Sequence, residues 1–244
     1  MILFFRLFLI LLAASSALNA GELPVSANYR TNLAAYWKCN ENAGVPRSQV
    51  GGSFAETFSG GAYLINSGKF GGAIFMDGVT DNMTTDGPTQ NDEFTVSFLI
   101  NTAVIPAVQG QVWQALSNGR WDVSLNTNGT LTFAPNTVNS RNYVVSTMTL
   151  TANRWYHVVT SYSALNTRSR LYINGSLVRG ASGFNTGGMA SDGGSPGFYI
   201  GGFASLFSGK FDEIAIWKRE LTKGEVEGLY AIYENRNMIN HGWQ

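Results

Sequence analysis

The chain has 244 residues, of which 44% are hydrophobic, 13% are charged and 28 are glycine. Sixteen Lys and Arg side chains balance sixteen Asp and Glu side chains, so the formal net charge is zero. This balance leaves no basic stripe that could follow a phosphate backbone, which excludes a typical nucleic-acid-binding protein. Few charges and many glycines are typical of a turn-rich β protein, and one sandwich domain of roughly 200–250 residues accounts for the length.

Residues 1–20 have the layout of a secretory signal peptide. One positive charge, Arg6, precedes an unbroken apolar run over residues 7–14, and small residues follow. The run is shorter than the ~20 apolar residues of a membrane span, and no second run approaches that length. The small residues favour cleavage after Ala17, with Ala20 as the alternative. We therefore expect an exported protein, secreted or at the cell surface, without a transmembrane segment.

After a polar lead-in over residues 21–33, apolar and aromatic patterns predict a series of strands. They are expected at residues 34–40, 70–76, 94–101, 112–116, 121–126, 130–134, 143–148, 155–162, 170–173, 176–179, 198–200 and 210–217. In the clearest of them, residues 94–101, apolar side chains occur on both faces, so we expect this strand to be covered on part of both faces.

Three Asn-Gly pairs lie between strand patterns: Asn118-Gly119, Asn128-Gly129 and Asn174-Gly175. An Asn-Gly pair is the strongest short-range hairpin signal, because both residues tolerate the positive φ of a type I′ turn. The pairs predict an antiparallel meander over residues 112–134 and a hairpin around residue 175.

Residues 221–233 depart from the strand pattern. Thr222 and Glu225 form a capping box, and apolar residues then repeat at helical spacing from Val226 to Tyr230. We expect a short C-terminal helix laid against the sandwich.

Seven segments carry a family resemblance. They are residues 35–41, 68–78, 94–98, 128–133, 155–159, 170–175 and 210–217. In this order and spacing they resemble the LamG-like jelly-roll family, within the concanavalin A-like lectin/glucanase superfamily. The resemblance implies an all-β fold, a two-sheet antiparallel jelly-roll sandwich, here with the short helix at its C-terminal end. We expect one domain over residues 34–234 and a tail over residues 235–244.

The last predicted strand contains the adjacent acids Asp212 and Glu213. Strict alternation places Asp212 on the face of two isoleucines and Glu213 on the opposite face. The resemblance implies a structural calcium ion (Ca²⁺) near the junction of the first and last strands. It nominates Asp212 as a ligand, helped by Glu41 or by a backbone carbonyl near Gly78. The alternative is that Asp212 accepts hydrogen bonds from backbone N–H groups of a neighbouring loop.

The sequence contains no recognisable catalytic motif. Glycoside hydrolysis needs two carboxylates close together, and the resemblance implies a Glu-x-Asp-x-Glu spacing that does not occur here. The adjacent pairs Asp92-Glu93 and Asp212-Glu213 are expected to point to opposite faces of their strands. No serine has a nucleophile-elbow context, and His157 fits a strand position better than a catalytic base. We predict no catalytic residues, with a glucanase as the disfavoured alternative.

Trp113, Arg120 and Tyr143 lie at or near predicted strand ends and are the candidate ligand-binding residues. A lectin-like site combines an aromatic face with a few polar groups, although Trp113 and Tyr143 also suit ordinary sandwich packing. Cys39, the only cysteine, lies in an apolar strand pattern, which favours a buried thiol over a disulfide between chains.

These features predict a secreted or cell-surface binding module for carbohydrate, a glycosylated surface or an extracellular protein. The alternative is a structural subunit of an extracellular assembly, such as a fibre, appendage or envelope layer, which would self-assemble. This alternative draws on the single-domain length, since no enzyme is attached to the expected binding domain.

Overall fold

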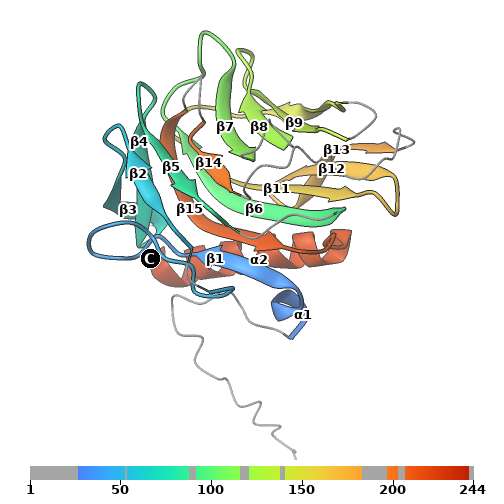
Figure 1. Cartoon of the computed structure of the whole chain (residues 1–244), viewed down its shortest axis with the longest axis horizontal. Coiled ribbons are helices and arrows are strands. Elements are labelled where there is room, and N and C mark those ends of the chain that lie inside the picture. Colours follow the sequence, from blue (N-terminus) through green and yellow to red (C-terminus); the bar gives the residue numbers. More distant parts are fainter. Residues whose placement is uncertain are drawn as a thin grey trace, which may run out of the picture.

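The computed structural model describes residues 27–52, 54–87, 92–115, 121–137, 141–182, 197–202 and 207–241. Over these residues two antiparallel sheets pack against each other, and a C-terminal helix lies along the outside of one of them (Figure 1). The expected all-β sandwich with a C-terminal helix is confirmed. The predicted signal peptide lies outside the described residues.

Within the described ranges, eight strands form the first sheet, in the order β13-β12-β11-β6-β15-β4-β3, with β1 paired to β15. Their bounds are β1 (Leu33–Trp37), β3 (Tyr63–Phe70), β4 (Gly72–Asp77), β6 (Glu93–Thr102), β11 (Trp155–Ser163), β12 (Arg168–Ile173), β13 (Ser176–Ser182) and β15 (Ser208–Trp217). The predicted strand over residues 94–101 becomes β6 at the centre of this sheet, and its side chains are buried on both faces as expected.

Seven strands form the second sheet in the described part of the chain, in the order β10-β9-β8-β7-β14-β5-β2. Their bounds are β2 (Thr57–Ser59), β5 (Asn82–Thr85), β7 (Gly110–Ala115), β8 (Trp121–Leu125), β9 (Thr130–Pro135), β10 (Val144–Thr149) and β14 (Phe198–Ile200). The strand pattern of the sequence does not predict β2, β3 or β5. These strands are short, polar or at a sheet edge, so pairing with distant strands rather than local apolar periodicity defines them.

Aromatic and aliphatic side chains fill the space between the two sheets. Trp113 and Trp121 of the second sheet meet Phe94 and Phe98 of the first, with ring centroids 5.3 Å apart for Phe94–Trp121 and 5.5 Å for Phe98–Trp113. Such aromatic pairs contribute about 0.5–1.5 kcal/mol each beyond the area they bury. This inter-sheet core accounts for most of the large apolar residues of the strand patterns.

Helix α2 (Lys223–His241) covers the outer face of the eight-stranded sheet (Figure 1). Val226, Leu229 and Tyr233 pack there against a second apolar cluster that includes Trp217. The helix continues past Tyr233 to His241 and so includes most of the predicted tail, residues 235–244. A short helix, α1 (Ala27–Arg30), precedes β1, and no helix in the described residues is long and apolar enough to cross a membrane.

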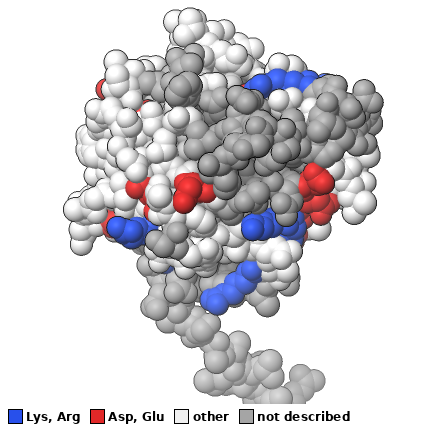
Figure 2. Space-filling model, viewed as in Figure 1, with Lys and Arg blue, Asp and Glu red and all other residues white. Residues whose placement is uncertain are grey.

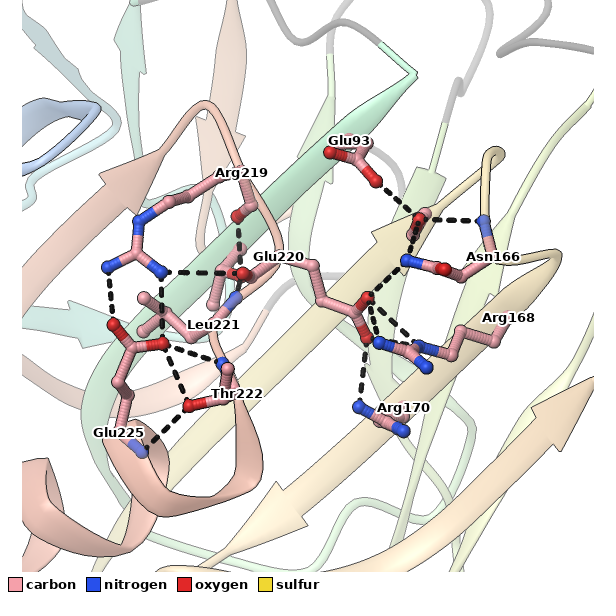
Figure 3. A network of polar contacts seen from close by, with 11 residues as sticks. Glu93, Asn166, Arg168, Arg170, Arg219, Glu220, Leu221, Thr222 and Glu225 are labelled. Atoms are coloured by element: carbon pink, nitrogen blue, oxygen red, sulfur yellow. Dashed lines mark hydrogen bonds and ion pairs between the residues drawn. The ribbon is translucent and has the colours of Figure 1, made fainter.

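The start of α2 is held by local and long-range polar contacts (Figure 3). The capping box is confirmed, since Glu225 accepts from Thr222 N–H at 2.8 Å and Thr222 Oγ1 accepts from Glu225 N–H at 3.2 Å. Just before the helix, Glu220 accepts hydrogen bonds from Arg168 and Arg170 of β12. The end of β15 and the helix are thereby fastened to the far side of the same sheet.

The described Asn-Gly pairs form two different turns. Asn174 and Gly175 both have positive φ, 51° and 75°, as the predicted type I′ turn requires. In the turn after β8 only Gly129 has positive φ, 81°, and its N–H donates to Asn126 O at 2.9 Å. That hairpin is therefore a longer turn with glycine in the left-handed conformation, while Asn118-Gly119 lies outside the described residues.

Candidate functional site

The outer face of the seven-stranded sheet is polar, whereas the outer face of the other sheet is covered by α2. In β8 the alternate residues pack in the inter-sheet core, so Asp122 and Ser124 lie on the outer face. Strand pairing brings Thr132 of β9 next to Ser124, and Thr84 of β5 next to Tyr199 of β14, on the same side. We call this layer of side chains the polar face; Asp122, Ser124 and Thr132 are only 5–6% exposed in it.

An exposed aromatic ring lies at one end of the polar face. Tyr143, directly before β10, is 63% exposed. The guanidinium of Arg141 lies 6.0 Å from its ring centroid and forms an ion pair with Asp122. The other oxygen of Asp122 accepts from Ser124 Oγ at 3.3 Å. Asp122 is largely buried and Arg141 partly exposed, so the carboxylate holds the guanidinium beside the tyrosine.

This arrangement has the parts of a sugar-binding site. A flat ring stacks on the apolar face of a pyranose or furanose, and a fork of N–H donors beside a carboxylate bonds neighbouring hydroxyls. On the side of the molecule shown in Figure 2, the charged side chains of the described residues are few and scattered. A site made of hydroxyl groups, one ring and one neutralised ion pair suits a neutral polyhydroxyl ligand better than a strongly charged one.

The predicted ligand-binding residues have different positions. The prediction for Trp113 is wrong, because its side chain is fully buried in the inter-sheet core, against Phe98 and Phe198. Arg120 lies outside the described residues. Tyr143 lies on the surface, and its role in binding stays a prediction.

Sequence reasoning missed the two partners of Tyr143. Arg141 stands two residues before it, and Asp122 alternates with core residues in β8. An outward carboxylate in a strand was a usable signal, but its pairing with Arg141 depends on the packing of β8 beside β9.

Asp212 is buried beneath α2 and accepts two backbone hydrogen bonds. Phe70 N–H donates to one carboxylate oxygen at 2.9 Å and Glu213 N–H to the other at 2.7 Å. Burial raises the pKa of Asp212 well above its usual range, and the carboxylate of Glu213 raises it further. This geometry agrees with the alternative to a calcium ligand, in which Asp212 accepts hydrogen bonds from backbone N–H groups.

The residues nominated for calcium do not form one set of ligands. Glu41 accepts from Arg47 N–H at 2.9 Å. Gly78 lies beside Ser208, four residues before Asp212 on β15, or about 13 Å at ~3.3 Å per residue. No three His, Cys, Asp or Glu side chains in the described residues converge as metal ligands. The described residues therefore do not fit the nominated site as a whole, and a calcium ion at Asp212 stays a prediction.

A β-bulge at Glu213 overturns the expected alternation in β15. Glu213 has a φ of 51°, and the register with β6 shifts between Asp212 and Ala215. Phe211, Ile214 and Ile216 consequently face the inter-sheet core, while Asp212, Ala215 and Trp217 face α2. The predicted opposition of the two acids is wrong, because the extra residue lets both carboxylates lie on the helix side.

Glu213 is the centre of a buried polar cluster under α2. Its carboxylate accepts from the Tyr36 hydroxyl and pairs with Arg236 of α2 at 3.2 Å. Burial raises the pKa of Glu213, and the Arg236 guanidinium partly offsets this rise. Nearby, His157 shares a hydrogen bond of 2.8 Å with Ser97 Oγ, and burial lowers the pKa of His157 to about 3. His157 is thus a neutral, packed strand residue, as the sequence favoured.

A family model described as the concanavalin A-like lectin/glucanases superfamily matches residues 77–227. The chain belongs to this superfamily. The resemblance to its LamG-like jelly rolls is confirmed. No curated protein sequence matches the chain.

Solved structures of binding domains share the fold of this superfamily member. The binding domain of Paraclostridial Mosquitocidal Protein 1 has a TM-score of 0.70 and 18% identity, over 84% of this chain and 53% of that one. Botulinum neurotoxin type C has a TM-score of 0.67 and 14% identity, over 85% and 52%. Domain 4 of AbnA, an extracellular arabinanase from Geobacillus stearothermophilus, has a TM-score of 0.64 and 18% identity, over 82% and 98%. The match spans about half the length of the toxin chains.

The superfamily also contains glucanases, whose chemistry needs two accessible carboxylates. Asp212 and Glu213 are two neighbouring carboxyl groups with raised pKa values, yet both are fully buried. Their oxygens are engaged by backbone N–H groups, Tyr36 and Arg236. A glycosidic bond cannot reach this pair while α2 stays in place.

Proposed function

We propose that this chain is an exported, non-enzymatic carbohydrate-binding module. Its ligand lies on the polar face, with a sugar ring stacked on Tyr143 and hydroxyl groups bonded to Arg141 and Asp122. The observation that carries the proposal is the exposed ring of Tyr143 beside the Arg141–Asp122 ion pair. An aromatic residue that is 63% exposed loses the benefit of burial, and a stacking ligand restores it.

The structural neighbours support a binding role. Domain 4 of AbnA is described in complex with arabinotriose, and cell entry of botulinum neurotoxin type C is described as dependent upon interaction with two ganglioside molecules. A related toxin domain is described in complex with rat synaptotagmin II, so a protein ligand is the main competitor. The site favours the sugar, because its accessible parts are the ring of Tyr143 and the partly exposed guanidinium of Arg141 rather than a large apolar patch.

A glycan array tests the proposal. The mature protein is applied with and without calcium, beside Tyr143→Ala and a matched control, Tyr63→Ala, which removes a 51% exposed tyrosine from β3 of the other sheet. We expect neutral glycans to bind the wild type and Tyr63→Ala alike. Tyr143→Ala should lose about tenfold in affinity, or about 1.4 kcal/mol, from the lost stacking.

Three results would contradict the proposal. They are the absence of binding to any glycan, equal binding by Tyr143→Ala, and equal loss in both variants. Thermal unfolding with and without calcium tests the predicted ion separately, since a structural Ca²⁺ would raise the melting temperature of the protein.

A structural subunit of an extracellular assembly is the second candidate. The observation that favours it is that β3 is an edge strand of the described eight-stranded sheet and carries the exposed Tyr63. An open edge strand offers N–H and C=O groups to another chain. Size-exclusion chromatography with light scattering decides this candidate, because a strict monomer at high concentration would remove it.

A further inference from the structure

A cavity of about 450 Å³ opens among the loops at one end of the sandwich. It lies between the turn after β4, the loop between β6 and β7, and the start of β15. Its volume falls within the roughly 300–1,000 Å³ of small-molecule sites. The lining residues belong neither to the polar face nor to the cluster under α2, so the proposed sugar site does not account for this cavity.

The floor and rim of the cavity are apolar. Leu125 and Phe207 line it as nearly fully buried side chains. Val104 and Val108 line it from the β6–β7 loop, and they are 55% and 71% exposed. Val79, 73% exposed, stands on the adjoining turn. Two exposed large apolar residues thus line the cavity and a third lies on the adjoining turn, and such a group of exposed apolar side chains is typical of a binding surface.

Among the described residues that line the cavity, Asp77 carries the charge. One carboxylate oxygen accepts from Val79 N–H at 2.7 Å and from Thr80 N–H at 3.3 Å, which fixes the side chain in the turn. The exposed carboxylate adds a negative charge at the edge of an apolar hollow. A ligand that complements both features combines an apolar chain with a positive charge.

We propose that this cavity is a second binding site, which takes a primary ammonium group carried on an aliphatic chain. The chain lies on Val104, Val108 and Phe207, and the ammonium group donates to Asp77. A lysine side chain of a protein and a free alkylamine share this chemistry. Carboxylate-bearing ligands are repelled by Asp77, and neutral alcohols of the same length keep only the apolar contacts.

Titrations followed by amide NMR spectra of the full-length mature protein test the site. The probes are n-hexylamine, 1-hexanol, hexanoate and N-acetyl-lysine methylamide. We expect n-hexylamine to shift the amide signals of Val79, Val104 and Gly110 and to bind about tenfold more tightly than 1-hexanol. Hexanoate should bind most weakly. N-acetyl-lysine methylamide identifies the source of the ammonium group, since binding as tight as that of n-hexylamine assigns the site to a lysine side chain.

Variants separate the charge from the apolar surface. Asp77→Asn keeps an oxygen acceptor for the turn, so it should lower n-hexylamine affinity to that of 1-hexanol without affecting the alcohol. Val108→Ser should weaken both ligands. The matched controls are Asp86→Asn, an exposed aspartate that also accepts from a backbone N–H, and Leu165→Ser, which removes an 82% exposed leucine. Neither control should change binding.

The proposal is overturned if hexanoate binds as well as n-hexylamine, or if Asp77→Asn leaves n-hexylamine affinity unchanged. Shifts confined to residues away from the cavity would overturn it as well, and so would the absence of any shift. The glycan array reports on a different face, so the two sites can fail independently.

Discussion

At the level of single residues, the neighbours of a side chain decide its chemistry. Tyr143 and Trp113 have similar strand contexts in sequence, yet one is a surface ring and the other part of the core. Asp212 and Asp77 are both aspartates in strands, but two backbone donors engage both oxygens of Asp212 under a helix. Asp77 remains exposed and able to bind a ligand.

The buried imidazole of His157 should make stability fall in acid. Its pKa is about 3 in the folded protein because of burial, against about 6.5 in the unfolded chain. Between these values the unfolded chain binds a proton that the folded protein does not, so stability falls as the pH falls through this window. Asp212 and Glu213, whose pKa values are raised, act in the opposite direction.

Comparison with His157→Gln isolates this contribution. The free energy of unfolding of the wild type should fall relative to that of the variant by roughly 3 kcal/mol from pH 7 to pH 4. Urea unfolding at several pH values measures the difference. A difference that does not change with pH would show that His157 does not titrate in this way.

At the level of elements, the bulge in β15 and the capping box of α2 determine how the last strand meets the helix. The bulge at Glu213 turns both adjacent acids toward α2, where Arg236 and Tyr36 meet Glu213. The helix that supplies Arg236 is positioned by its capping box and by the contacts of Glu220 with β12 (Figure 3). The bulge and the cap thus act on the same interface, between β15 and α2.

The capping box can be tested by Thr222→Ala. The hydroxyl of Thr222 accepts from Glu225 N–H and donates to its carboxylate. We expect the free energy of unfolding to fall by about 1 kcal/mol, the usual cost of losing such a cap. Urea unfolding measures this, with Thr127→Ala, at an exposed turn position, as the control that should change stability by less than about 0.5 kcal/mol. Equal effects of the two changes would assign no role to the cap.

At the level of the whole molecule, the two sheets have different tasks. The eight-stranded sheet buries its outer face under α2, and the seven-stranded sheet keeps a polar outer face. The loops at one end of the sandwich enclose the cavity beside Asp77. Scaffold, polar face and cavity are thus separate parts of one domain.

Removal of α2 should abolish the native packing. A chain that ends at Thr222 would expose the apolar cluster around Trp217 together with Asp212 and Glu213. We expect loss of the near-ultraviolet circular dichroism signal and binding of the dye ANS, the signs of lost tertiary packing. A chain that ends at Arg236 keeps the described contacts of the helix and serves as the control. Cooperative unfolding of the shorter chain would show that the sheets need no helix.

Local signals predicted much of the fold. Strand periodicity located β6, β11 and β15, the Asn174-Gly175 turn has the predicted φ values, and the Thr222 capping box is formed. Each of these depends on residues a few positions apart. The motif order also indicated the superfamily, which the family model confirms.

The candidate sites were less predictable. The sequence indicates Tyr143 as a candidate but not Arg141 or Asp122, and it also indicates Trp113, which the structure buries in the inter-sheet core. Glu213 has positive φ although it is neither glycine nor asparagine, so the residue type at this position does not predict the bulge.

The sequence by itself determined an antiparallel β domain with a capped C-terminal helix, because periodicity, turn chemistry and capping act over short distances. Only the tertiary structure decided which face of a strand is covered and which charges meet. It also decided which loops enclose a cavity. The physical reason is that burial and ion pairing depend on residues far apart in the chain, such as Asp122 with Arg141, or Asp77 with Phe207.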